Sequence, residues 1–271
     1  MTLRRRARLV SILSQILAIL GIAVPGVVVV SALGYGRYAL GILLVAILGA
    51  IVVRRSVTTA YLKKSMLGSM NRYRDAVERE DEPAMRQEIE WFVSAYAGTK
   101  KAVARAIADL YSAILLVDTE RFQDGMRMLE AIPRDTLPKP LHPTMLWHLA
   151  WCKANSGEPE EALLLARQLL DQPGTQFTDE LIGALRGSAL FYAHRYQEAL
   201  SPLSEALAGD LSPYNRACAE HYLGLSLESL SRWQEARSAF QRSVGAAECK
   251  WARRSREHLA EPRRDQHALT E

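Results

Sequence analysis

The segment Arg195-Tyr196-Gln197-Glu198-Ala199 returns 37 residues later as Arg232-Trp233-Gln234-Glu235-Ala236. Two earlier segments stand in the same register, Arg121-Phe122-Gln123-Asp124-Gly125 and Glu158-Pro159-Glu160-Glu161-Ala162. A further small residue precedes the end of each segment by twelve positions, at Ala113, Ala150, Gly187 and Gly224. Self-similarity at a fixed period of this size indicates a chain built from stacked copies of one supersecondary unit.

Each copy has the local chemistry of helices. Ser231 followed by Gln234 is typical of a capping box that opens a helix, and Asn155-Ser156-Gly157 is typical of a helix end. An apolar stripe at helical spacing is formed by Ala162, Leu163, Ala166, Leu169 and Leu170. No window alternates as a half-buried strand does. The sequence therefore predicts an all-α fold in which each copy is a pair of helices.

This pattern resembles the tetratricopeptide repeat (TPR), in which two antiparallel helices cross at small residues and an aromatic residue stands just before the second. Phe122, Tyr196 and Trp233 fill the aromatic column, and Pro159 departs from it. The Trp-Leu pair that opens the family pattern is mostly missing, and the copies are longer than the usual 34 or so residues. The resemblance implies four divergent TPR-like repeats over about 105–247, stacked as an α-solenoid.

The segments on either side of these repeats extend the helical prediction. One period earlier, 57–104 contains a basic juxtamembrane segment and a degenerate first hairpin at about 65–97, in which Glu88 stands where a small residue is expected. Beyond the repeats, 248–271 is predicted to form a cap helix and a loose tail.

The first 56 residues have a different character, with seven basic residues and no acidic one. Apolar runs at about 9–33 and 38–53 are long enough, or nearly so, to cross a bilayer as a hairpin of two transmembrane helices. Basic residues flank both outer ends and only Arg37 lies between the runs. The positive-inside rule then predicts an integral protein of a bacterial-type inner membrane with both termini cytoplasmic. The alternative is a signal peptide cleaved near Val30-Ser31-Ala32, which the length of the first run disfavours.

Basic residues continue beyond the second run, before the first carboxylate of the chain at Asp75. We expect them to contact anionic lipid headgroups; they are Arg54, Arg55, Lys63, Lys64, Arg72 and Arg74. The alternative is that they only reflect the basic bias of cytoplasmic flanks. After position 56 the chain holds 34 − 7 = 27 basic and 30 acidic residues. A nucleic-acid partner is therefore not expected.

No catalytic or metal-binding motif stands out in the sequence. His148 and Cys152 lie four positions apart with His142 nearby, but a structural zinc site needs four ligands and no second pair completes it. The sequence contains no Gly-rich phosphate loop, no His-Glu-x-x-His and no Gly-x-Ser-x-Gly. Three widely spaced cysteines favour reduced thiols over a disulfide framework. We expect no enzymatic activity, no cofactor, no metal and no small-molecule substrate.

The repeat register also predicts which side chains face the inner groove, where TPR proteins commonly hold peptides. The two groove columns are Leu110, Trp147, Ala184, His221 and Ile114, Trp151, Ser188, Leu225. Trp147 and Trp151, one helical turn apart, are predicted to form an apolar patch with Leu110 and Ile114 that anchors a partner helix or peptide. The alternative is that both tryptophans belong to the core. The Lys, Asn and Arg residues of carboxylate-clamping members do not occur in these columns.

These features predict a membrane-anchored TPR scaffold or adaptor that binds protein partners at the cytoplasmic membrane face. The alternative is a regulatory subunit of a membrane enzyme or envelope-assembly complex that acts through its hairpin. Small residues that favour close helix packing in a membrane support this second hypothesis; they are Gly41, Ala46, Gly49 and Ala50.

Overall fold

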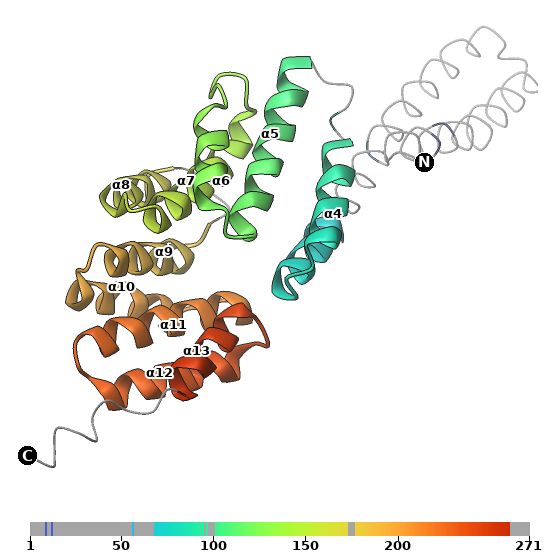
Figure 1. Ribbon diagram of the computed structural model, residues 1–271. Helices are drawn as coiled ribbons and strands as arrows, with labels where there is room; N and C mark the ends of the chain where they lie inside the picture. Colours follow the sequence, from blue (N-terminus) through green and yellow to red (C-terminus); the bar gives the residue numbers. More distant parts are fainter. Residues whose placement is uncertain are drawn as a thin grey trace, which may run out of the picture. The chain divides into compact units, whose positions relative to one another are not determined.

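The computed structural model describes residues 68–94, 96, 101–172 and 177–260, together with Leu9, Ile12 and Ser56. Within these residues every regular element is a helix, as predicted, and 68–78 is helical in addition to the labelled elements (Figure 1). The labelled elements are α4 (Glu82–Ser94), α5 (Lys101–Asp118), α6 (Phe122–Glu130), η3 (Lys139–Leu141), α7 (His142–Asn155), α8 (Pro159–Leu170), α9 (Asp179–Tyr192), α10 (Tyr196–Ala208), α11 (Pro213–Ser229), α12 (Trp233–Ala246) and α13 (Lys250–Ala260).

The predicted localisation in a membrane requires correction. Among the helices of the described residues, none combines the length and the apolar character that crossing a bilayer requires. The segments 9–33 and 38–53, on which the prediction was based, lie outside the described residues except for Leu9 and Ile12, whose side chains are both exposed. The prediction of an integral membrane protein with two cytoplasmic termini is therefore not carried forward.

The chain divides into two compact units, 1–74 with 87–98 and 75–86 with 99–271. In the first unit, Glu88 occupies the position where the repeat pattern expects a small residue. Its carboxylate accepts hydrogen bonds from Ser69 Oγ at 2.6 Å and from Arg72 Nε at 2.6 Å. Burial favours a raised pKa for Glu88, but these bonds outweigh burial and hold the pKa below its usual range. A polar contact thus takes the place of a close helix crossing.

In the second unit, helices pair along the chain as α5 with α6, α7 with α8, α9 with α10 and α11 with α12 (Figure 1). The first helix of each pair also packs against the first helix of the next, and α13 packs against α11 and α12. We call the side formed by these first helices and α13 the inner face. Each pair contacts its neighbours in sequence, as in a solenoid of helical repeats.

Close crossings within two of the pairs require glycine. A Cβ atom added to Gly187 on α9 would overlap the side chain of Leu203 on α10. A Cβ added to Gly224 on α11 would lie 2.5 Å from Cε1 of Phe240 on α12. Both glycines belong to the column of small residues that the sequence repeats. The column therefore marks the places where two helices touch most closely.

A left-handed residue ends the first helix of every pair. Positive φ angles occur at Glu120 (63°), Gly157 (90°), His194 (57°) and Ser231 (59°), which are spaced 37 residues apart. At each of these turns the next N–H bonds the carbonyl five residues before it, for example Arg232 N to Leu227 O at 2.9 Å, which is a Schellman ending. Ser231 was expected to cap α12. Because its backbone completes the turn of α11, α12 begins instead after Arg232, without a side-chain cap.

Candidate functional site

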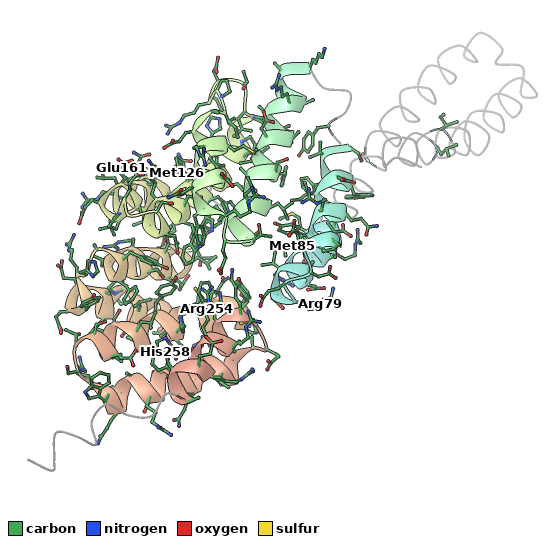
Figure 2. The ribbon with its side chains drawn as sticks, in the orientation of Figure 1. Arg79, Met85, Met126, Glu161, Arg254 and His258 are labelled. Carbon is green, nitrogen blue, oxygen red and sulfur yellow. The ribbon has the colours of Figure 1, made fainter. Side chains whose placement is uncertain are left out.

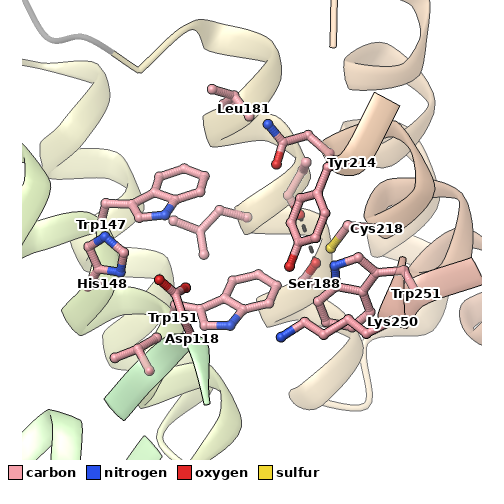
Figure 3. A pocket seen from close by; sticks show the side chains of 14 residues that line it. Asp118, Trp147, His148, Trp151, Leu181, Ser188, Tyr214, Cys218, Lys250 and Trp251 are labelled. Atoms are coloured by element: carbon pink, nitrogen blue, oxygen red, sulfur yellow. Dashed lines mark hydrogen bonds between the residues drawn. The ribbon is translucent and has the colours of Figure 1, made fainter. Parts of the chain in front are cut away.

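A pocket of about 100 Å³ opens on the inner face of the second unit (Figure 3). Of the eight predicted groove residues, four line it: Trp147 and Trp151 of α7, and Ala184 and Ser188 of α9. The rest of the wall comes from these two helices and from α5, α11 and α13; its polar and aromatic members include Asp118, His148, Tyr214, Asn215, Lys250 and Trp251. Aromatic rings with a few polar groups among them are typical of ligand pockets.

The other four predicted groove residues do not line this pocket. Leu110 and Ile114 are buried side chains of α5, with exposed fractions of 0% and 5%. His221 is buried and Leu225 is half-buried. The two tryptophans therefore face the pocket with Ala184 and Ser188 rather than with Leu110 and Ile114.

Aromatic rings of α7, α11 and α13 meet beside the pocket that Ala184 and Ser188 of α9 also line. The centroid of the Trp151 ring lies 6.0 Å from that of Tyr222 on α11 and 6.1 Å from that of Trp251 on α13, both edge to face. Ser188 Oγ donates to Ala184 O at 2.9 Å, so the hydroxyl is satisfied within its own helix. Larger side chains at positions 184 and 188 would push the aromatic rings of α7 away from those of α11 and α13. The inner face is therefore more tightly closed than an open groove.

Two hydrogen bonds of Tyr192, one to Asn155 and one with Tyr222, join three helices of the inner face. Tyr192 donates its hydroxyl hydrogen to Asn155 Oδ1 at 2.6 Å, and the Tyr192 and Tyr222 oxygens are 2.9 Å apart. Because Tyr192 donates to Asn155, Tyr222 is the donor of the second bond. Burial raises the pKa of both phenols, most strongly that of Tyr222. Both remain protonated at neutral pH, so the chain of bonds links α7, α9 and α11.

Ion pairs and cation–π contacts between α13 and the rest of the unit close the inner face. On α13, Lys250 Nζ lies 3.2 Å from Glu120 Oε1 and 5.1 Å from the centroid of the Trp251 ring. Arg254 lies 2.6 Å from Glu120 Oε2 and 5.2 Å from the same centroid (Figure 2). Burial alone would raise the pKa of Glu120, but the charges of Lys250 and Arg254 hold it below its usual range. The partners are 130 or more residues apart, and no local pattern links them.

His221 joins α11 to α13 from a buried position. Its Nδ1 lies 3.0 Å from Ser255 Oγ, which donates to Ser243 Oγ at 2.9 Å, and Ser243 donates to Ala217 O at 2.8 Å. Since the Ser255 hydrogen goes to Ser243, Nδ1 of His221 is the donor to Ser255. Burial, with the charges of His258 and Arg254, lowers the pKa of His221 to about 3. The ring is therefore neutral at pH 7.

The histidine and cysteine side chains considered for metal binding have other surroundings. His142 Nε2 lies 3.0 Å from Arg134 O and 2.9 Å from Leu137 O, so it stabilises the loop that precedes α7. Burial raises the pKa of Cys152 to about 12 and lowers the pKa of His148. Within the described parts of the chain, no three His, Cys, Asp or Glu side chains are grouped as metal ligands. A buried neutral thiol of this kind is a poor nucleophile.

The basic residues predicted to contact lipid are only partly described. Arg54, Arg55, Lys63 and Lys64 lie outside the described residues. The guanidinium of Arg72 pairs with Glu88 in both Nε–Oε1 and Nη2–Oε2 contacts. Lipid contact therefore has no support from the surroundings of Arg72.

Comparison with known proteins gives one match. Residues 137–225, about a third of the chain, match a family model described as tetratrico peptide repeat. No curated protein and no solved structure matches the chain significantly. The matched segment contains α7 to α10 and most of α11, and so includes Trp147, Trp151, Ala184 and Ser188 but not Trp251. The match and the paired helices support a divergent tetratricopeptide repeat region, of the type that serves as a scaffold for protein–protein interaction.

Proposed function

We propose that this chain is a non-enzymatic scaffold that binds a segment of a protein partner at the inner-face pocket. The observation on which the proposal depends is that Trp147 and Trp151 remain partly exposed at a pocket, one turn apart on α7. Tryptophan is among the residue types that contribute most to the free energy of binding at protein interfaces, particularly where it lies in a pocket.

Polar groups around the aromatic walls favour a peptide over a purely apolar ligand. Asp118, Asn215 and Lys250 line the pocket. They offer a bound segment a carboxylate, an amide and an ammonium group. Trp147 is held in place by stacking on Phe177, with ring centroids 4.6 Å apart and planes 5° apart. A side chain fixed in this way loses little rotamer entropy when it binds a partner. The hypothesis of a regulatory subunit depended on a membrane hairpin and is not carried forward.

The test compares two tryptophans of the full chain. Trp147→Ala should lower capture of the principal partner at least tenfold in a crosslinking pull-down, because it removes one wall of the pocket. Trp233→Ala is the matched control, since Trp233 is 39% exposed and belongs to α12, away from the pocket. Equal capture by the two variants, with helix content unchanged, would place the binding surface elsewhere.

A further inference from the structure

Helix α13 differs from the other helices of the second unit in how it is attached. It contains four basic residues among eleven, Lys250, Arg253, Arg254 and Arg256, and only one large apolar side chain that is buried, Trp251. By contrast, α11 buries several large side chains, among them Tyr222, Leu223 and Leu227. Besides Trp251, α13 is held by ion pairs, by the hydrogen bonds of Ser255 and by the ring of His258. A segment with few large buried apolar side chains opens at a lower free energy than the core.

Three of these four cations are matched by acidic side chains that come from distant parts of the same unit, while Arg256 pairs with the nearby Glu248. Arg253 lies 2.8 Å from Glu80 Oε2, while Lys250 and Arg254 share the carboxylate of Glu120. The indole of Trp251 lies against Trp151, His221 and Tyr222, at centroid distances of 6.1, 5.7 and 5.5 Å. We call this site the seat: its aromatic side chains are Trp151, His221 and Tyr222, and its carboxylates are Glu80 and Glu120. Helix α13 presents to it an aromatic residue flanked by cations.

We propose that α13 is an internal ligand of this seat, and that a partner helix of the same chemistry competes for it. The partner would present an aromatic residue with a basic residue just before it and an arginine three positions after it, as in Lys250-Trp251-Ala252-Arg253-Arg254. This inference builds on the proposed function, because it names the chemistry of the segment that the inner face accepts.

Two features of the structure favour exchange of α13. The connection from α12 to α13 contains no helix, and Ala247, which ends α12, has extended backbone (φ −160°, ψ 152°), so the two helices are separate segments. The pocket of about 100 Å³ lies directly beside Lys250 and Trp251, so departure of α13 would enlarge it by the space of an indole and uncover Trp151 and Tyr222. Aromatic surface uncovered in this way provides the anchor that an incoming helix requires.

Competition between a tethered and a free helix gives a direct test. A protease recognition sequence is inserted between Ala247 and Glu248 of the full chain, and a fluorescent peptide of residues 248–260 is titrated before and after cleavage. A tethered ligand acts at an effective concentration on the order of millimolar. Cleavage should therefore strengthen apparent binding of the peptide at least tenfold, as measured by anisotropy. A peptide with Trp251→Ala should bind at least tenfold more weakly than the native peptide.

Charge exchange identifies the seat. Glu120→Lys should abolish binding of the native peptide, and a peptide with Lys250→Glu and Arg254→Glu should restore it. Glu205→Gln is the matched control on the receptor, since the Glu205 carboxylate meets Ser201 Oγ on α10 and should leave binding unchanged. The proposal would be overturned if the affinity for the peptide changed neither with Glu120→Lys nor with cleavage. It would also be overturned if circular dichroism showed that the cut chain unfolds.

A second measurement uses the unmodified chain. Amide hydrogens of α13 should exchange through local opening, faster than those of α11. Equal protection of the two helices would mean that α13 leaves only on global unfolding, which contradicts the proposal. The outcome is separate from that of the proposed function: if Trp147→Ala loses the partner while the peptide never binds, the scaffold stands and the internal-ligand inference fails.

Discussion

The α11–α12 hairpin and helix α13 meet at the same aromatic cluster, but different forces hold them there. Within the hairpin, Gly224 lets the Phe240 ring lie against the backbone of α11, and both residues are buried. At α13, Trp251 makes the main apolar contact and Glu120 neutralises two cations. Close packing between chain neighbours is insensitive to salt and pH, whereas a contact formed by charges and a buried histidine is sensitive to both.

The largest effect is expected inside the hairpin. Phe240 is 3% exposed and its ring lies against Gly224 of α11, so Phe240→Ala should lower the free energy of unfolding by about 3–5 kcal/mol. Thermal or denaturant unfolding of the full chain measures the change. Trp233→Ala on the same helix, at an exposed position, should cost less than about 1 kcal/mol. Similar losses in the two variants would contradict the account of the hairpin.

A smaller loss is expected where a side chain is added at the crossing. Gly224→Leu should overpack the contact with Phe240 and cost about 1–3 kcal/mol. Gly245→Ala provides the control, because a Cβ at Gly245 meets nothing within 4 Å and alanine is the better helix former. The control should leave the melting midpoint unchanged or raise it. An unchanged midpoint for Gly224→Leu would mean that the repeat register is incorrect.

Acid should weaken the attachment of α13 through His221. The pKa of this residue is about 3 in the folded state, lower than its ordinary value, so the unfolded chain binds the extra proton. The stabilisation is complete above about pH 6.5 and declines by roughly 1.4 kcal/mol per pH unit as the pH falls toward 3. His221→Asn should flatten this dependence relative to the native chain. Unfolding curves between pH 7 and 5 measure it, and parallel pH profiles of the two proteins would contradict it.

The smallest effect is expected at the turns. Ser231 is exposed with φ of 59°, a left-handed conformation that costs a non-glycine residue about 1 kcal/mol or slightly more. Ser231→Gly should therefore raise the free energy of unfolding by up to about 1 kcal/mol. Gly157→Ala, at φ of 90°, should lower it by a similar or larger amount. If Ser231→Gly raises the free energy of unfolding and Gly157→Ala lowers it, the two turns share one left-handed backbone conformation.

The helical class and the 37-residue spacing of the repeats could be predicted from the sequence alone, while the binding role of Trp147 and Trp151 stays a prediction. These features are local, because a repeat touches mainly its neighbours and the period records those contacts. Ala184 and Ser188 were predicted to line the groove, although nothing in the sequence indicated that the rings of Trp151 and Tyr222 would lie 6.0 Å apart.

The way the inner face closes could not be predicted from the sequence. The pairing of Glu120 with Lys250 and Arg254, the burial of His221 and the seat of Trp251 all depend on the rotation that accumulates from one helix pair to the next. A small error in that rotation at each pair would separate these groups by many ångströms, and no single window of sequence specifies it. Ser231 illustrates the same limit at short range: its side chain favours a cap, but the ending of the preceding helix imposes a left-handed turn.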